Sequence, residues 1–126
     1  MLAGIGVDIA EIARFERMIE RFHDRIAQRI LTGNELSQFQ HRKSSSAFLA
    51  LRFAAKEAAS KALGCGMTGG IGFHSIEVVN DQSGKPELVF HGAAKKLIQQ
   101  RNISRTLLSL SDERHYAVAM VVLESD

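Results

Sequence analysis

The chain has 126 residues, 45% hydrophobic and 24% charged, an ordinary balance for a single soluble domain spanning 1–126. A net charge of +2 is too small for a protein that wraps nucleic acid, so no nucleic-acid partner is expected. The one cysteine, Cys65, excludes an internal disulfide and a cysteine-based zinc site, and it indicates a reducing compartment, the cytoplasm. Apolar runs stay well below the roughly 18 residues of a membrane span, so no membrane partner is expected either.

The first part of the chain changes from a strand pattern to a helical one. Residues 2–9 predict a short strand with small residues on one side, and Asp8 stands near its end. From Ile12 to about Leu31, apolar residues recur at spacings of three and four, which predicts one long amphipathic helix. Thr32 and Glu35 then form a capping-box pattern, which predicts the start of a short helix.

A second long helix is predicted after three serines. Ser44, Ser45 and Ser46 are candidate N-caps for the alanine-rich segment 47–63, and Gly64 is placed to end it. The composition of this helix predicts that most of it is buried. The glycine-rich stretch that follows is interpreted either as a hinge or as backbone that approaches a ligand closely.

The rest of the chain predicts strands joined by short turns. The expected elements are a hairpin formed by 76–79 and 87–90, a helix at 93–100, and strands at 106–110 and 116–123. Local hairpins without regular strand–helix–strand alternation favour an α+β fold, with an antiparallel-type sheet packed against long helices in a single domain.

Five polar residues interrupt the alanine-rich helix within about half of its circumference: Arg52, Lys56, Glu57, Ser60 and Lys61. One interpretation is a solvated face with a Glu57–Lys61 ion pair worth about 0.3–0.5 kcal/mol. The other is a phosphate site, in which Glu57 holds a hard cation while Lys56 and Lys61 neutralise phosphate oxygens.

Asp8 is an acid in a strand of small and aliphatic residues, where a buried carboxylate needs compensation. It either caps a helix that begins near Ala10 or binds a metal. Because magnesium usually takes only one or two protein carboxylates, Asp8 and Glu57 would suffice for that ion.

Five arginines follow one another along the first predicted helix, beside its apolar stripe: Arg14, Arg17, Arg21, Arg25 and Arg29. We call this set the basic rail. Acidic residues flank it, so it is either a mixed solvated face or a surface that docks an acidic partner. Aromatic residues make up only 6% of the chain, which favours an acidic protein over stacked bases.

Two segments taken together resemble a known family. Gly4–Ile9 and Arg52–Ala62 resemble the two signatures of phosphopantetheinyl transferases. The Gly84-Lys85-Pro86 turn and the ending Asp112–Ala117 are similar to the short branch of that family, and the resemblance covers essentially the whole chain. It implies the 4′-phosphopantetheinyl transferase fold.

The resemblance also implies a reaction: transfer of 4′-phosphopantetheine from coenzyme A to a serine of an apo acyl carrier protein, with release of adenosine 3′,5′-bisphosphate. Magnesium is the implied ion, with Asp8 and Glu57 as its ligands. As a hypothesis, Glu57 takes the serine proton, directly or through water, and Lys61 stabilises the departing bisphosphate.

By the same resemblance, the residues that bind coenzyme A are Arg52, Lys56, Lys61, Gly64, Lys85 and Pro86. The acidic carrier protein docks on Arg14, Arg21 and Arg25, and the protein is a homotrimer with active sites between subunits. Two alternatives stay open: a basic-helix module that binds RNA or DNA, and an inactive trimeric scaffold of the same fold.

Overall fold

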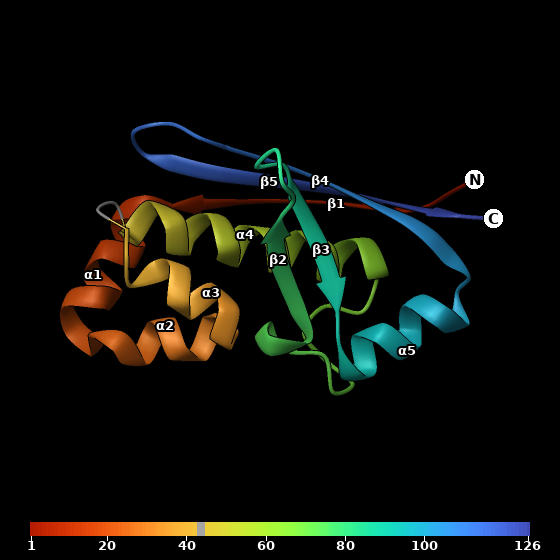
Figure 1. Cartoon of the computed structure of the whole chain (residues 1–126), viewed down its shortest axis with the longest axis horizontal. Coiled ribbons are helices and arrows are strands. Elements are labelled where there is room, and N and C mark those ends of the chain that lie inside the picture. Colours follow the sequence, from red (N-terminus) through yellow and green to blue (C-terminus); the bar gives the residue numbers. More distant parts are fainter. Residues whose placement is uncertain (43–44) are drawn as a thin grey trace.

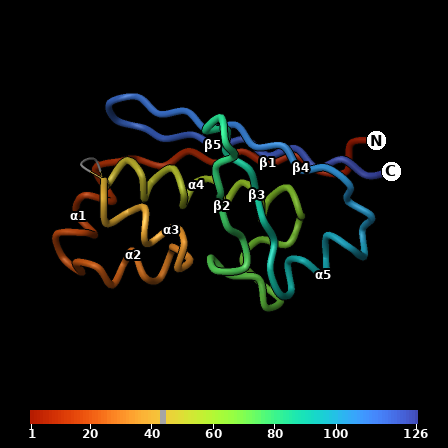
Figure 2. Tube along the Cα trace, viewed as in Figure 1, coloured from red at the N-terminus to blue at the C-terminus, as the bar shows by residue number. Residues whose placement is uncertain are grey.

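The computed structural model describes residues 1–42 and 45–126. Figures 1 and 2 show a sheet lying along one long helix, with shorter helices and a hairpin on the far side of that helix. The elements in chain order are β1 (Leu2–Glu11), α1 (Ile12–Phe22), α2 (Asp24–Ile30), α3 (Gly33–Phe39), α4 (Ser45–Leu63), the 3₁₀ turn η1 (Phe73–Ser75), β2 (Ile76–Asn80), β3 (Pro86–Phe90), α5 (Gly92–Gln100), β4 (Ile103–Asp112) and β5 (Tyr116–Ser125). The predicted α+β class and single domain are confirmed.

The main sheet has the order β1-β5-β4, with both pairs antiparallel. Side chains alternate across it, so every second residue of β5 from Ala117 to Leu123 is fully buried against α4. The same alternation turns Gly4, Gly6, Asp8 and Ala10 of β1 toward α4. The side of the sheet that carries small residues is therefore the side on which the long helix lies.

Two glycines set the distance between β1 and α4. A Cβ atom at Gly6 would collide with the carbonyl oxygen of Ala58 and lie 2.8 Å from the backbone nitrogen of Ala62. A Cβ atom at Gly4 would collide with the carbonyl oxygen of Ala62. The strand thus packs on helix backbone and alanine methyl groups, and this close approach brings Asp8 near the polar residues of α4.

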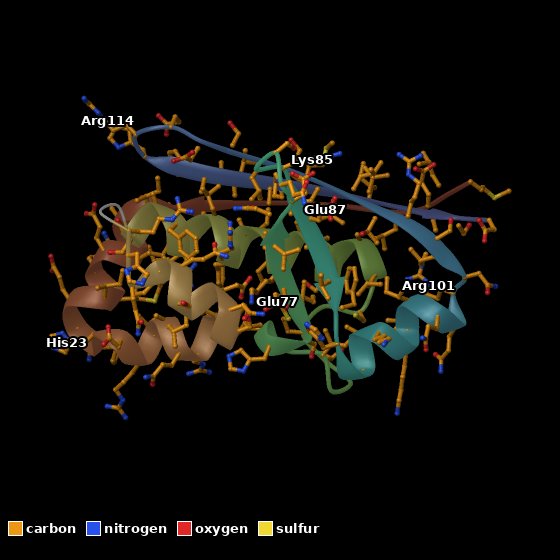
Figure 3. The ribbon with its side chains drawn as sticks, in the orientation of Figure 1. His23, Glu77, Lys85, Glu87, Arg101 and Arg114 are labelled. Carbon is orange, nitrogen blue, oxygen red and sulfur yellow. The ribbon has the colours of Figure 1, made fainter. Side chains whose placement is uncertain are left out.

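The prediction of one helix from Ile12 to Leu31 is wrong, because the chain breaks at His23. His23 takes a positive φ of 52°, its N–H donates to the carbonyl of Ile19, and α2 begins at the next residue. Figure 3 shows His23 at the outer corner where the chain turns. Phe22, one of the apolar residues that recur at spacings of three and four, is 43% exposed at this corner.

Most of the other local predictions are confirmed. Thr32 and Glu35 form the predicted capping box at the start of α3. Gly64 follows α4 with a φ of 81°, a conformation that suits glycine. The β2–β3 hairpin, α5 and the last two strands lie where they were expected. The prediction of Ser45 and Ser46 as N-caps of α4 is wrong, because both lie within the helix, and Ser44, the third candidate, lies outside the described residues.

The sheet face that points away from α4 carries apolar side chains. Figure 1 shows none of the described helices on that side. Ile5, Val7 and Ile9 of β1 are 70%, 56% and 65% exposed, and Met120 of β5 is 44% exposed. An apolar face of this kind usually marks a contact surface. Within the described ranges 1–42 and 45–126, no helix is both long and apolar enough to cross a membrane.

Candidate active site

Asp8, Glu57 and Lys61 gather where β1 lies against α4. The Lys61 Nζ donates to the Asp8 Oδ1 at 3.0 Å and to the carbonyl oxygen of Val7 at 3.1 Å. Glu57 is one turn before Lys61 on the same face of α4. We call these three residues the acid–lysine cluster.

Two earlier interpretations are corrected by this geometry. Asp8 lies within β1, paired in register with Ala119, so it caps no helix; the residue that precedes α1 is Glu11, which makes no side-chain cap. Lys61 forms its ion pair with Asp8, 53 positions earlier in the chain, and not with Glu57 on its own helix. The partner of a surface lysine was thus set by the tertiary fold.

The electrostatics of the cluster are those of two acids held together. Partial burial raises the pKa of Glu57 above its ordinary value, and the nearby charge of Asp8 raises it further, while Lys61 and Arg14 oppose the shift. Two neighbouring carboxylates with one lysine leave negative charge that a cation would neutralise.

The donor set of the cluster fits magnesium. Among the residues that the structure describes, no three His, Cys, Asp or Glu side chains gather as a complete metal cage. Magnesium does not need one, because it keeps several waters and is commonly held by one or two carboxylates together with substrate phosphates. Asp8 and Glu57 are the two residues that would hold it here.

Arg52 lies on another part of α4 and lines a cleft of about 530 Å³. The other lining residues are Arg42, Ala47, Phe48, Leu51, Asn80, Gly84, Pro86, Leu110 and Asp112. Two guanidinium groups meet there, since those of Arg52 and Arg42 lie 4.5 and 4.9 Å from the ring centre of Phe48.

The state of Arg52 shows what the cleft can bind. Burial lowers the pKa of Arg52, the Glu35 charge opposes this shift, and the Arg42 charge adds to it. The Nε of Arg52 is buried on the side of Glu35, 4.0 Å from its carboxylate, and has no hydrogen-bond partner among residues 1–42 and 45–126. Two guanidinium groups in one lining make the cleft suitable for an anion such as phosphate.

The predicted contact of Lys56 with phosphate does not fit its position. Its side chain is fully buried, and its ammonium donates to the Glu35 carboxylate at 2.6 Å and to the carbonyl oxygen of Phe73 at 2.8 Å. Burial lowers the pKa of Lys56, while Glu35 opposes the shift. Lys56 therefore balances a buried acid inside the protein.

The remaining predicted residues for coenzyme A lie apart from one another. Pro86 lines the cleft with Arg52, whereas Lys85 is exposed in the turn of the hairpin (Figure 3). Gly64 follows the last turn of α4, beyond Lys61. Because Arg52 and Glu57 are five residues apart, they point about 140° away from each other around α4. Within one chain, the predicted residues thus form an acid–lysine cluster and a separate arginine cleft.

The cleft also contains residues that the sequence analysis did not single out, notably Arg42 and Asn80. Their only signal in the sequence is their nearness to predicted features: Arg42 precedes the long helix, and Asn80 precedes the hairpin turn.

The basic rail is exposed on two helices. Arg14, Arg17 and Arg21 lie on α1, while Arg25 and Arg29 lie on α2 beyond the break. Arg17 is paired with Glu11 at 3.3 Å. The guanidinium of Arg14 lies 5.3 Å from the ring centre of Phe53, and its charge acts on Glu57, so the rail begins beside the acid–lysine cluster.

Comparisons with known proteins agree with the fold. Residues 4–121 match the sequence model of the 4'-phosphopantetheinyl transferase superfamily. A holo-[acyl-carrier-protein] synthase of Halorhodospira halophila is 54% identical over 123 residues, which cover 98% of each chain. The crystal structure of the holo-[acyl-carrier-protein] synthase from Neisseria meningitidis has a TM-score of 0.93 at 42% identity, covering 99% of this chain and 100% of that one. The structure of a holo-(acyl-carrier-protein) synthase from Bacillus anthracis in complex with CoA (3',5'-ADP) has a TM-score of 0.84 at 41% identity. The match covers 100% of this chain and 99% of that one.

Proposed function

Because the chain belongs to the 4'-phosphopantetheinyl transferase superfamily, we propose that it transfers 4′-phosphopantetheine from coenzyme A to a serine of an apo acyl carrier protein. The products are the holo carrier and adenosine 3′,5′-bisphosphate, and the reaction depends on magnesium. The observation that carries the proposal is the acid–lysine cluster, in which two carboxylates and one ammonium lie together at the junction of β1 and α4. Relatives named as synthases of the holo carrier protein, and one in complex with CoA, support the choice of substrates.

Each residue of the acid–lysine cluster has its own role in this transfer. Glu57 accepts the proton of the serine hydroxyl, since a carboxyl with a raised pKa is a better proton acceptor. The serine oxygen forms its bond to the phosphorus on the pantetheine side as the bond from that phosphorus to the adenosine 3′,5′-bisphosphate breaks. The Lys61 ammonium neutralises the charge that develops on the departing phosphate. Asp8 and Glu57 would hold magnesium, which would supply Lewis-acid polarisation of the phosphate oxygens.

The arginine cleft binds a phosphate group of coenzyme A in this proposal. Arg52 and Arg42 contribute two positive charges to its lining. Pro86 and Gly84 of the hairpin turn form another part of the wall. Lys85, exposed in the same turn, and Gly64, after the end of α4, are proposed as further contacts with coenzyme A.

The direct test is the release of the second product. On addition of an apo carrier to protein, coenzyme A and magnesium, chromatography should show adenosine 3′,5′-bisphosphate rising in step with carrier consumed. A carrier with its acceptor serine changed to alanine is the control and should give none. Release at the same rate with that control would show hydrolysis of coenzyme A, contrary to the proposal.

We also propose that three copies of the chain assemble through the exposed apolar face of the sheet. Ile5, Val7 and Ile9 form a row on the outer side of β1, and an edge strand with such a row is a poor surface to leave in water. Since the arginine cleft and the acid–lysine cluster lie apart within one chain, a neighbouring subunit that joins them completes the site.

Replacing Ile5 by glutamate should dissociate this assembly, because the charge would be buried among apolar side chains. Light scattering coupled to gel filtration is expected to give three times the 13.9 kDa chain mass for the unchanged protein and a smaller mass for the variant. Ile5→Thr, which keeps the branched shape without a charge, should stay assembled. A monomeric unchanged protein with full transfer activity would refute the trimer.

The basic rail is proposed as the docking surface for the acidic carrier protein, through Arg14, Arg21 and Arg25. Charge reversal in Arg21→Glu should raise the KM for the carrier by about tenfold, which corresponds to about 1.4 kcal/mol, and should weaken its dependence on salt. The KM for coenzyme A should not change. Lys95→Glu on α5, an exposed reversal on another helix, is the matched control. Equal effects of the two variants on the carrier KM would exclude the rail as the docking surface.

A further inference from the structure

A buried charge network lies behind the arginine cleft. Its centre is Glu35 on α3, whose side chain is fully buried. One carboxylate oxygen of Glu35 accepts from the Lys56 ammonium at 2.6 Å and from the Thr32 N–H at 2.9 Å. The other accepts from the Val78 N–H at 2.8 Å and lies 4.0 Å from the Nε of Arg52. A single carboxylate therefore joins α3, α4 and β2.

These contacts reach two walls of the cleft. On one wall, two residues of α3 contact the guanidinium of Arg52. The Glu35 carboxylate faces its Nε, and the Gln38 Oε1 accepts a hydrogen bond from its Nη2 at 3.4 Å. The other wall is the end of β2 and the turn after it, where Asn80 lies two residues beyond Val78. The hydroxyl of Thr32 adds a second tie from α3 to β2, donating to Glu77 at 2.6 Å.

The two cations of the network are bound to different degrees. Lys56 is enclosed by Glu35 and the carbonyl of Phe73, so the Glu35 carboxylate is largely occupied by this lysine. Arg52 stays at ion-pair distance from Glu35 but without a hydrogen bond from its Nε. Glu35 can thus orient the guanidinium from its Nε side, while Arg52 brings its positive charge to the lining of the cleft.

We propose that Glu35 and Gln38 are positioning residues: they set the Arg52 guanidinium and the β2–β3 turn relative to each other, and so determine the affinity of the cleft for a phosphate group of coenzyme A. This role rests on the proposed function. It assigns no contact between α3 and the substrate, because Gln38 acts through Arg52, and Glu35 acts through Arg52 and β2.

The first test uses Gln38→Leu at a half-buried position. This substitution removes the hydrogen bond from the Arg52 Nη2 and leaves the buried Glu35–Lys56 ion pair intact. The KM for coenzyme A should rise about fivefold, with kcat within twofold of the unchanged protein. In an Arg52→Ala background, the same substitution should change the KM by less than twofold, since it acts through that arginine. Gln40→Leu, at the exposed end of the same helix, is the control and should leave the KM unchanged.

The second test removes Glu35 and Lys56 together, as Glu35→Gln with Lys56→Met, so that neither charge is left buried alone. The KM for coenzyme A should rise at least tenfold. Calorimetry should show the same loss of affinity for coenzyme A without turnover, and circular dichroism should show a folded protein. If this pair does not fold, Gln38→Leu and its cycle with Arg52→Ala decide the question.

Three results would overturn the positioning role: an unchanged KM, a fall in kcat with unchanged KM, or equal effects of Gln38→Leu with and without Arg52. These failures differ from failure of the proposed function. That function fails if the unchanged protein makes no holo carrier, whereas the positioning role fails only when an active protein tolerates the substitutions.

Discussion

Replacing Glu57 by glutamine should lower kcat by about two to four orders of magnitude, the range that a positioned general base contributes. Glutamine keeps the shape of the side chain but neither accepts the serine proton nor offers a negative charge to a cation. Burial and Asp8 raise the pKa of Glu57, which means that the negative charge of this side chain destabilises the folded state. We therefore expect the variant to be at least as stable as the unchanged protein while losing activity.

Single-turnover measurements with saturating magnesium, coenzyme A and carrier would check this loss. Glu124→Gln is the matched control, because Glu124 is also a partly exposed acid that faces a basic group, Arg105 at 3.5 Å. It should retain nearly full activity. Near-full turnover of Glu57→Gln would remove both the base role and the metal role from this residue.

Replacing Gly6 by alanine should destabilise the protein by about 3 kcal/mol, the upper part of the range for overpacking. The new methyl group would meet the backbone of α4 at Ala58 and Ala62, and backbone cannot rotate away as a side chain can. The strand must shift from the helix, which also carries Asp8 away from Lys61. Activity should therefore fall together with stability.

Gly33→Ala is the matched control for this substitution. A Cβ atom at Gly33 meets nothing within 4 Å, and this residue is the first of α3. Alanine there should leave stability within about 0.5 kcal/mol of the unchanged protein, the usual range for surface substitutions. Urea denaturation of both variants measures the difference. Equal stabilities would contradict the close packing of β1 on α4.

Local signals explain which parts of this fold could be predicted. The capping box at Thr32, the glycine after α4 and the turn ending at Pro86 depend on residues a few positions apart, so the sequence carries them directly. The break at His23 could not be predicted, because neither glycine nor proline marks it and the apolar spacing continues across it. The positive φ of His23 lets α2 turn back against α1, a contact between helices that local spacing does not reveal.

In the candidate site, too, the sequence predicts what depends on nearby residues and misses what depends on tertiary packing. Periodicity places Glu57 and Lys61 on one face of a helix, but it does not show that Asp8 joins them from 53 positions before Lys61. The resemblance to a family supplied that pairing, and the structure brings the three residues together. Lys56 shows the opposite error: adjacent to Glu57 in the chain, it points to another side of α4 and pairs with Glu35, 21 positions earlier. Adjacent residues on a helix differ by about 100° in direction, so neighbours in sequence need not share a site.

The most direct measurement is the intact mass of an apo acyl carrier protein after incubation with this protein and coenzyme A, in parallel with magnesium and with a chelator. We expect a carrier heavier by one phosphopantetheine group with magnesium and an unchanged mass with the chelator. An unchanged mass with magnesium, while another transferase modifies the same carrier, would contradict the proposed transfer.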